Sequence, residues 1–393
     1  MKQAPVVPEQ LRATADVVVV GAGALGAACA YYLSAEGFSV QVVDRGKIAG
    51  GTSSACEGNL LVSDKEAGPE LDLALYSHAL WHGELAEHGP LWEFDSKGGL
   101  VVAQTDTGAG ALADLTRRQR ASGIEVREVA PDDIRGYEPH IRPGLTGAAF
   151  YPQDSQVQPM LMVAHLLRLA RRRGAAVSTD TEVTGLLRDG DHVTGVRTTR
   201  GSVGSAHVVN AAGPWAAEVA RLAGVHVPVL PRRGFVLVTE PVPVTVRHKV
   251  YAGEYVASTQ SSDEGLQTST VIEGTRSGTI LIGSSRERVG FDRRVSVAAM
   301  SEIAGKCLAL FPSLARTKIM RSYHGFRPYC PDHLPVIGPD SRAPGLWHAG
   351  GHEGAGIGLS VGTGKLLAQL LAGRRPELDM APFDPNRFSG VGA

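Results

Sequence analysis

The spacing of hydrophobic residues near the start of the chain predicts a strand, a helix and a second strand. Residues 17–20 are all valine, residues 24–35 are small or apolar, and residues 39–43 are again mostly valine. No charged residue interrupts the nineteen positions from Val17 to Ala35. Because about twenty apolar residues are enough to span a bilayer, this pattern alone fits a membrane anchor as well as a buried strand and helix.

Three glycines within this run favour the buried strand and helix. Gly21, Gly23 and Gly26 follow the first strand with the spacing G-x-G-x-x-G, and Asp44 ends the second strand 23 positions after Gly21. In a dinucleotide-binding fold these glycines permit a tight turn, admit the pyrophosphate and allow the helix to pack on the strand. Asp44 can then accept hydrogen bonds from ribose hydroxyls. We therefore interpret the run as a nucleotide site, with a glycine-rich core turn as the alternative.

The rest of the chain mixes helix and strand patterns. Helices are predicted over residues 70–87 and 159–173, and strands over residues 92–104, 181–188, 192–198 and 206–210. The Asp189-Gly190 pair joins two of these strands as a hairpin. From residue 227 to residue 287 the pattern has a period of two and the residues are β-prone, which predicts a separate antiparallel sheet.

Composition narrows the function classes. The chain has 393 residues, which predicts two domains or one domain with a large insert. A net charge of -1 gives no basic field for nucleic acid or an anionic membrane. Its four cysteines contain no C-x-x-C pair, so neither a zinc site nor an iron–sulfur cluster is expected. We interpret them as free thiols of a cytoplasmic protein: Cys29, Cys56, Cys307 and Cys330.

A run of small and hydroxyl residues at 50–59 follows Asp44 and would let a planar ring and a phosphate lie against the backbone. With the segments 209–215, 283–287, 325–328 and 352–359, it makes the chain resemble the FAD-dependent D-amino-acid oxidase superfamily, which includes glycine oxidase, sarcosine oxidase and hydroxyproline dehydrogenase. Residues 57–65 and 351–354 carry a narrower resemblance, to the flavin subunit of D-hydroxyproline dehydrogenase and of opine oxidases.

This resemblance implies an α/β (α+β) fold with a discontinuous Rossmann-like FAD-binding domain and an inserted antiparallel β-sheet substrate domain. The expected FAD-binding domain comprises residues 15–90, 142–225 and 320–393, and the substrate domain residues 91–141 and 226–319. The valine at the position of Val183 lies against the adenine in the family. The implied FAD-binding residues are Gly21, Gly23, Ala24, Leu25, Gly26, Asp44, Arg45, Thr52, Ser53, Gly58, Asn59, Leu60, Val183, Ala211, Gly213, Trp215, Gly325, Gly354, Gly356 and Ile357.

The resemblance also implies a non-covalent flavin. In sarcosine oxidases the cysteine that links the flavin precedes a Pro-Asp pair by six positions, and counting back from Pro331 gives Gly325 in this chain. Cys330 is therefore interpreted as a free structural thiol.

Arg327 is the first candidate for contact with the substrate. Its guanidinium offers a planar fork to a carboxylate, and in amino-acid oxidases of this superfamily the arginine of a Gly-Phe/Leu-Arg-Pro segment binds the substrate carboxylate. Tyr251 and Tyr255 are four residues apart in a predicted strand and would project from one face, either to line the substrate pocket or to pack in the core.

His352 and Glu353 stand at the turn before a helix that is predicted to start near Gly354, where N–H groups would face the flavin pyrimidine edge. Glycine oxidase-like members have a basic residue near this turn, so Glu353 is a departure that argues against an identical substrate. His78 and His82 have metal-ligand spacing, but no third ligand is evident and no metal is expected.

These features together predict an FAD enzyme that oxidises the C–N bond of a D-amino acid or secondary amine by hydride transfer to flavin N5. D-hydroxyproline, proline, a glycine-like compound and an opine are the substrates considered. Oxygen or a partner redox subunit would accept the electrons, in a hetero- or homo-oligomer, with neither nucleic acid nor a membrane-spanning segment involved.

Two alternatives remain open from the sequence. A 2-hydroxy acid dehydrogenase would need a base such as His324 or His352 beside the substrate hydroxyl. A flavin-carrying subunit of a multi-subunit electron-transfer complex would be inactive alone.

Overall fold

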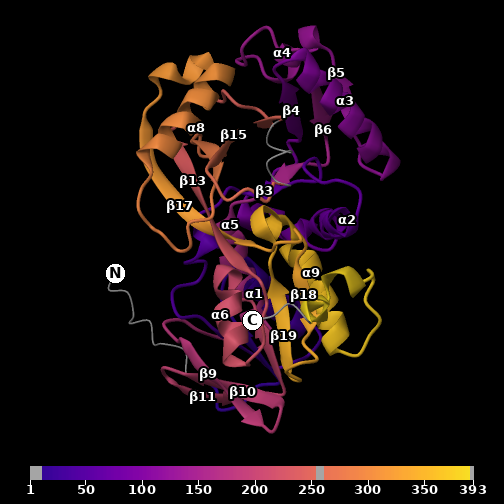
Figure 1. Cartoon of the computed structure of the whole chain (residues 1–393), viewed down its shortest axis with the longest axis vertical. Coiled ribbons are helices and arrows are strands. Elements are labelled where there is room, and N and C mark those ends of the chain that lie inside the picture. The colour runs from indigo at the N-terminus through magenta and orange to yellow at the C-terminus, as the bar shows by residue number, and fades with distance from the viewer. Residues whose placement is uncertain (1–10, 254–260, 390–393) are drawn as a thin grey trace.

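The computed structural model describes residues 11–253 and 261–389, which form two lobes along the long axis of the molecule (Figure 1). One lobe is built on a six-stranded sheet with the order β18-β19-β12-β1-β2-β8. All neighbours in this sheet are parallel except β18 and β19. Its strands are β1 (Val17–Val20), β2 (Val40–Val43), β8 (Ala176–Ser178), β12 (His207–Asn210), β18 (Val336–Pro339) and β19 (Leu346–Gly350).

The valines of β1 explain why this sheet is buried on both faces. Val17 and Val19 pack in one hydrophobic cluster with the three helices that cover that face, while Val18 and Val20 pack in a second cluster on the other face. The three helices are α1 (Ala24–Ala35), α5 (Pro159–Arg172) and α9 (Gly356–Leu371). The uncharged run from Val17 to Ala35 is therefore β1, a turn and α1.

The opposite face carries α6 (Ala216–Leu222) and a three-stranded sheet. This sheet consists of β9 (Val183–Asp189), β10 (His192–Thr198) and β11 (Gly201–Gly204). Between the lobes lie α2 (Pro69–His82) and the short pair of β3 (Asn59–Leu60) with β7 (Ser155–Gln156) (Figure 1).

The second lobe is built on an eight-stranded sheet with the order β17-β13-β16-β15-β14-β4-β6-β5, antiparallel except for β14 against β4. Its strands are β4 (Gly99–Ala103), β5 (Arg127–Val129), β6 (Gly147–Tyr151), β13 (Leu230–Thr239), β14 (Lys249–Ala252), β15 (Gln267–Gly274), β16 (Ile280–Arg286) and β17 (Ile319–Tyr329). Among the described residues, the helices of this lobe are α3 (Asp106–Ala121), α4 (Ile134–Tyr137) and α8 (Val297–Leu310). Apolar residues of α8 share a hydrophobic cluster with this sheet.

The architecture agrees with the predicted fold class, but two strands within the ranges expected for the FAD-binding domain belong to the large sheet. β6 falls in the range 142–225, yet it pairs with β4. β17 begins at the boundary of the range 320–393 and pairs with β13 over almost its whole length.

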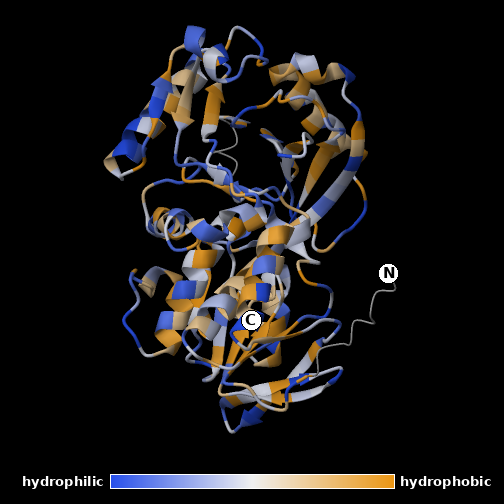
Figure 2. Ribbon diagram, turned by 180° about the vertical axis from the view of Figure 1, so that it is seen from behind, coloured by the Kyte–Doolittle hydropathy of each residue, from blue (hydrophilic) through white to orange (hydrophobic). Residues whose placement is uncertain are grey.

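Hydropathy follows the same architecture. Figure 2 shows hydrophobic strands inside the lobe with the six-stranded sheet and a largely hydrophilic outer helix at the far end of the other lobe. Within residues 11–253 and 261–389, none of the helices combines the length and the apolar character that crossing a membrane requires.

Candidate active site

A cavity of about 930 Å³ lies where the two lobes meet. The lobe with the six-stranded sheet contributes the turn after β1, the end of β2, residues 211–215 and the start of α9. The large sheet contributes residues of β13 and β17. The segment 50–59 runs along the cavity. The carboxyl ends of the parallel strands therefore open into this space, which is where doubly wound sheets bind ligands.

The predicted glycine turn has the close contacts that exclude larger residues. Gly21 has a φ of +114°, and a Cβ there would lie 2.4 Å from the carbonyl oxygen of Ala211. A Cβ on Gly26 would lie 1.8 Å from the oxygen of Gly21, so this glycine packs α1 against the turn and does not line the cavity. Gly23 does line the cavity, and the backbone stays accessible there.

Two helices begin at the cavity. Their N-cap residues, Gly23 of α1 and Ala355 of α9, offer no side-chain cap, and their first residues, Ala24 and Gly356, line the cavity. The N–H of Ala24 is bonded to Ser53 Oγ. The remaining N–H groups and the positive end of the helix dipole favour an anion, so the α1 start fits a pyrophosphate and the α9 start fits an electron-rich ring edge.

The end of β2 shapes one end of the cavity. Asp44 accepts hydrogen bonds of 2.7 Å from the N–H groups of Ala22 and Gly46, which holds the glycine turn. The guanidinium of Arg45 lies 4.2 Å from the ring centroid of Trp215, whose other partner is the stacked ring of Phe291, 5.3 Å away. The predicted adenine contact, Val183, lines the cavity, as do Ala211 and Gly213.

The segment 50–59 is fixed to both lobes. Ser53 Oγ accepts a 3.0 Å hydrogen bond from the N–H of Ala24, and Thr52 Oγ1 donates a 2.6 Å hydrogen bond to the carbonyl of Phe326 on β17. Asn59 also lines the cavity. Gly58 does not, because its Cα lies against the backbone of Val157, where a Cβ would be 1.8 Å from the carbonyl oxygen.

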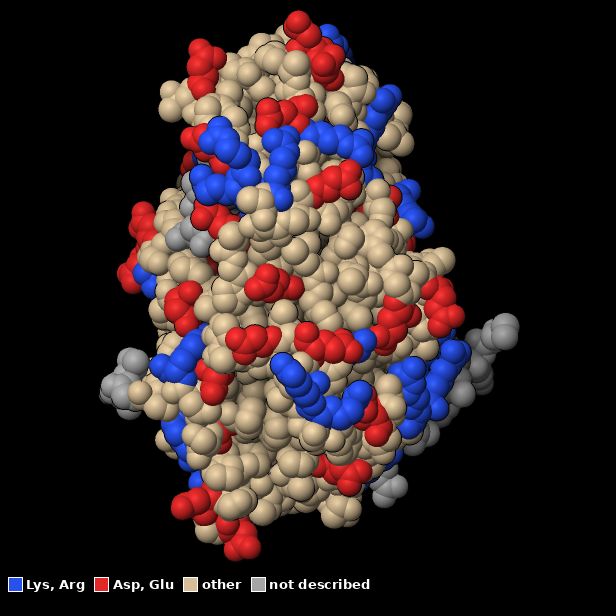
Figure 3. All heavy atoms as spheres, turned by 90° about the vertical axis from the view of Figure 1, so that its right-hand side faces the viewer, with Lys and Arg blue, Asp and Glu red and all other residues tan. Residues whose placement is uncertain are grey.

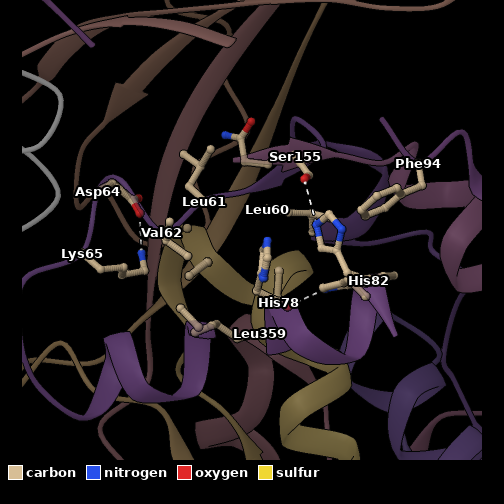
Figure 4. Close-up of a pocket in the computed structure, with 16 residues that line it drawn as sticks. Leu60, Leu61, Val62, Asp64, Lys65, His78, His82, Phe94, Ser155 and Leu359 are labelled. Carbon is tan, nitrogen blue, oxygen red and sulfur yellow. Dashed lines mark hydrogen bonds and ion pairs between the residues drawn. The ribbon is translucent and has the colours of Figure 1, made fainter. Parts of the chain in front are cut away.

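Leu60 lines a second, much smaller cavity, together with His78 and His82 (Figure 4). The two imidazole centroids are 4.1 Å apart, and His82 Nε2 lies 3.5 Å from Ser155 Oγ. Burial lowers the pKa of His78 to about 4. In the described parts of the chain, no group of three or more His, Cys, Asp and Glu side chains is arranged to hold a metal ion.

Arg327 reaches the cavity from β17. Side chains alternate along this strand, so Gly325 and Arg327 face the cavity while His324 and Phe326 face Phe235 and Phe291. Arg327 Nη1 donates a 2.8 Å hydrogen bond to the carbonyl of Ser285, which fixes one arm of the guanidinium.

Glu57 is a site residue that the sequence analysis did not single out. It lines the cavity and is only 8% exposed. Burial raises the pKa of its carboxyl, an effect that the nearby charges of Lys249 and Arg327 oppose. A signal was present in the sequence, because Glu57 is the one charged residue within the run 50–59 of small and polar residues.

His352 lies outside the cavity, which corrects its prediction, and Tyr251 takes the core-packing alternative. Tyr251 is fully buried in the hydrophobic core, where its hydroxyl contacts Ser63 and donates a 3.2 Å hydrogen bond to Asp154, and it does not line the cavity. His352 is also buried away from the cavity, with Nε2 2.8 Å from Thr363 Oγ1, and burial lowers its pKa to about 3. Tyr255 lies outside the described residues.

Glu353, next to His352, does line the cavity and is paired with a cation. Its carboxylate forms an ion pair with the fully buried Arg232, 2.7 Å away, and His333 Nδ1 lies 3.5 Å from it. Burial alone would raise the pKa of Glu353, but the neighbouring His333 and the charges of Arg286 and Arg232 hold it below its ordinary value. The departure from a basic residue at this turn is thus offset by arginines from the large sheet.

The cavity fits FAD by these observations: a glycine turn without room for a Cβ, the starts of two helices and residues from both lobes along its length. Of the free cysteines, Cys330 is fully buried and Cys56 lines the cavity. Burial raises the pKa of the Cys56 thiol to about 12, so this thiol is protonated near neutral pH and is a poor nucleophile.

One family model and several full-length relatives match this chain. The model of the DAO family, described as FAD dependent oxidoreductase, matches residues 16–370. The hydrogen cyanide synthase subunit HcnC of Pseudomonas aeruginosa is 30% identical over 95% of this chain and 96% of its own length. Glycine oxidase of Geobacillus kaustophilus is 31% identical over 95% of this chain and 97% of its own length.

Solved structures agree with the fold. The crystal structure of glycine oxidase from Geobacillus kaustophilus superposes with a TM-score of 0.87 at 28% identity, covering 96% of this chain and 99% of that one. The structure of L-proline dehydrogenase from P. horikoshii has the same TM-score of 0.87 and the same coverage at 22% identity. At that identity the second likeness is evidence for the fold alone.

Proposed function

Because this chain belongs to the DAO family of FAD-dependent oxidoreductases, we propose that it oxidises the carbon–nitrogen bond of an amino acid or a secondary amine. FAD is its cofactor, and we propose that it is held without a covalent bond. The observation that carries the proposal is Arg327, whose guanidinium lines the cavity from the substrate sheet while the dinucleotide-binding elements line it from the other lobe. Bound FAD would accept a hydride from the substrate carbon.

The residues of this chain would supply binding and orientation. The starts of α1 and α9 would hold the two electron-rich parts of FAD, Asp44 would accept hydrogen bonds from the ribose, and Val183 would contact the adenine. Arg327 would bind the substrate carboxylate with its planar fork and so fix which substrate carbon faces the flavin. No strong base is required for this role.

Among substrates, we propose D-amino acids and secondary amines of the proline, hydroxyproline, glycine or opine type. Two full-length relatives are glycine oxidases, which supports a small amino acid. The alternative of 2-hydroxy acid oxidation loses its two proposed bases, because His352 is buried away from the cavity and His324 projects from the opposite face of β17.

A second candidate function is that of a flavin-carrying subunit. A relative that this chain matches over nearly its full length is described as a hydrogen cyanide synthase subunit, which supports a partner protein. That partner or oxygen would reoxidise the flavin. We also propose a cytoplasmic location, because each of the four cysteines is a free thiol.

The test is the visible spectrum of the purified flavoprotein without oxygen, before and after addition of D-amino acids, glycine, sarcosine, proline isomers, hydroxyprolines, opines and 2-hydroxy acids. We expect one class of amines to bleach the flavin band, and readmitted air then separates an oxidase from a dehydrogenase. Bleaching by 2-hydroxy acids alone contradicts the proposal. A flavin that every compound leaves oxidised favours the subunit function.

A further inference from the structure

We propose that Glu57 binds the cationic nitrogen of the substrate whose carboxylate is bound by Arg327, and that it selects amines over acids of the same shape that lack this nitrogen. This proposal rests on the proposed amine-oxidising function. It assigns a specificity role to a residue that neither the glycine motif nor the arginine motif contains.

Glu57 has a buried carboxylate oxygen that no described residue donates to. Glu57 lines the cavity and is 8% exposed, yet its Oε1 has no hydrogen-bond partner among the described residues. Its other oxygen receives only a long hydrogen bond of 3.4 Å from Asn59 Nδ2. A buried carboxylate oxygen without a donor is costly, so a ligand that supplies N–H groups would gain from contact with it.

The carboxylate of Glu57 is held in a fixed place by the backbone around it. A Cβ built on Gly283 of β16 would lie 2.4 Å from Glu57 Oε1, so the carboxylate packs directly against the backbone of the substrate sheet. The segment that carries Glu57 is itself fixed to both lobes through Ser53 and Thr52. A ligand that binds here meets a preorganised acceptor, which reduces the ordering cost of binding.

A positive charge near Glu57 is already paired with another carboxylate. The nearby cation Lys249 forms a 2.5 Å ion pair with Glu273, and both side chains are almost completely buried. The charge of Lys249 is thus largely matched by Glu273, and burial still raises the pKa of Glu57. A cationic nitrogen placed in the cavity would supply the missing positive charge and stabilise the ionised carboxylate.

The two charges also match the substrate class. Glu57 and Arg327 line the same cavity. An amino acid is a zwitterion whose carboxylate and ammonium flank one carbon. A cavity lined by a guanidinium and a carboxylate therefore complements both charges of the amino acid, whereas a simple hydrocarbon acid offers only a carboxylate, which matches Arg327 alone.

The experiment compares ligands that differ only at the nitrogen. Sarcosine is paired with butyrate, and proline with cyclopentanecarboxylate, because each acid replaces N–H with a carbon group of similar size. Binding to the oxidised holoenzyme is followed by the perturbation of the flavin spectrum, and turnover by anaerobic bleaching. The variants are Glu57→Gln, which keeps the shape without the charge, and Glu57→Asp, which keeps the charge on a shorter side chain.

In Glu57→Gln we expect amine affinity to fall roughly tenfold to a hundredfold, the loss typical of a hydrogen bond to a charged group, while the paired acids bind as in the wild type. Glu57→Asp should retain part of the preference for amines. Flavin content and thermal midpoint report whether each variant folds. The control is Glu87→Gln, whose side chain is 78% exposed and lies outside the cavity, and which should change neither ligand's affinity.

The outcomes separate the two proposals. If amines bleach the wild-type flavin but Glu57→Gln weakens amine and acid alike, or weakens neither, the role of Glu57 is wrong and the function stands. If none of the amines bleaches or perturbs the wild-type flavin, the proposed function fails, and the role of Glu57 fails with it.

Discussion

Arg327 can extend into the cavity because the neighbouring strand, β13, has a glycine without a side chain at the position that the guanidinium covers. Gly234 of β13 is the partner of Gly325 in the register, and a Cβ there would lie 2.1 Å from Arg327 Nη1. The guanidinium thus lies over bare backbone, with Nη1 bound to the carbonyl of Ser285. One arm of the fork is fixed by the protein, which orients the remaining N–H groups before a substrate arrives.

The orientation of Arg327 leads to a prediction that differs from that for Glu57. Arg327→Lys keeps the positive charge but removes the planar fork, so the carboxylate of every ligand should be held less well. We expect KM for the amine substrate to rise about tenfold or more, and butyrate to lose affinity in the same proportion. Flavin perturbation titrations measure both ligands. Unchanged butyrate binding in this variant would contradict the assignment of Arg327 to the carboxylate.

His352 supports a prediction about stability at acid pH. Burial lowers its pKa from 6.5 to about 3 in the folded protein, so the unfolded chain binds a proton that the folded chain refuses between these values. The stabilisation from neutral His352 is therefore complete above pH 6.5 and is lost as the pH falls, by up to about 1.4 kcal/mol for each pH unit.

Replacement of His352 should remove this acid sensitivity. Chemical denaturation at pH 7 and pH 5 is expected to show a smaller pH-dependent loss of unfolding free energy in His352→Asn than in the wild type. The pH profile of turnover should keep its shape, because this imidazole does not touch the cavity. Equal losses in the two proteins would show that another group causes the acid sensitivity.

Residues set by local backbone geometry could be predicted, and those set by side-chain direction could not. The glycines and Asp44 follow from a turn whose shape depends on adjacent residues. Tyr251 shows the limit, because alternation along β14 is visible in the sequence but the face that meets the core is not. Val250 and Tyr251 pack in different hydrophobic clusters, and neither side chain lines the cavity.

At the scale of elements, the site depends on how closely α1 and α9 pack, because both helix starts line the cavity. Small residues permit this contact. A Cβ on Gly364 of α9 would lie 2.7 Å from backbone atoms of Ala28 in α1. The position of one helix start relative to the other is therefore set about two turns away from the cavity, by a residue that no ligand touches.

Gly364→Ala should accordingly weaken FAD binding although the residue is remote from the cofactor. Overpacking of this kind costs about 1–3 kcal/mol of stability, and separation of the helices would move their N–H groups out of register with FAD. Thermal midpoint and flavin retention on gel filtration measure the two effects. Gly305→Ala is the matched control, since this exposed glycine of α8 has nothing within 4 Å of an added Cβ.

The control variant should instead gain stability by roughly 0.5–1 kcal/mol, because alanine is the better helix former in an exposed helix interior. If both alanines lower flavin retention equally, the effect is not specific to the contact between α1 and α9.

The strand that β17 pairs with could not be predicted from the sequence. Its Gly-Phe-Arg-Pro segment was assigned to the FAD-binding domain by resemblance, but the strand pairs with β13 of the large sheet. Strand pairing over long sequence separation leaves no local signal, whereas the β1-α1-β2 order does, because consecutive elements of a parallel sheet lie next to one another.

At the scale of the whole molecule, the two lobes are held together at the cavity that they share, and complementary surface charge contributes little. Figure 3 shows acidic and basic side chains interspersed over the visible face, in keeping with a net charge of -1. The lobes are joined instead by the segment 50–59, which is hydrogen-bonded to α1 on one side and to β17 on the other. A ligand that fills the cavity should therefore act on both lobes at once.

This arrangement predicts that FAD stabilises the two lobes together. A ligand that binds only the folded state at a hundredfold excess over its Kd adds about 2.7 kcal/mol, so the thermal midpoint of the FAD-depleted protein should rise with added FAD. Hydrogen exchange should show new protection at the start of α1 and at residues 325–328 of β17, which line the cavity from opposite lobes. Protection confined to α1 would mean that FAD binds the lobe with the six-stranded sheet alone, and that β17 reaches the site only when substrate is present.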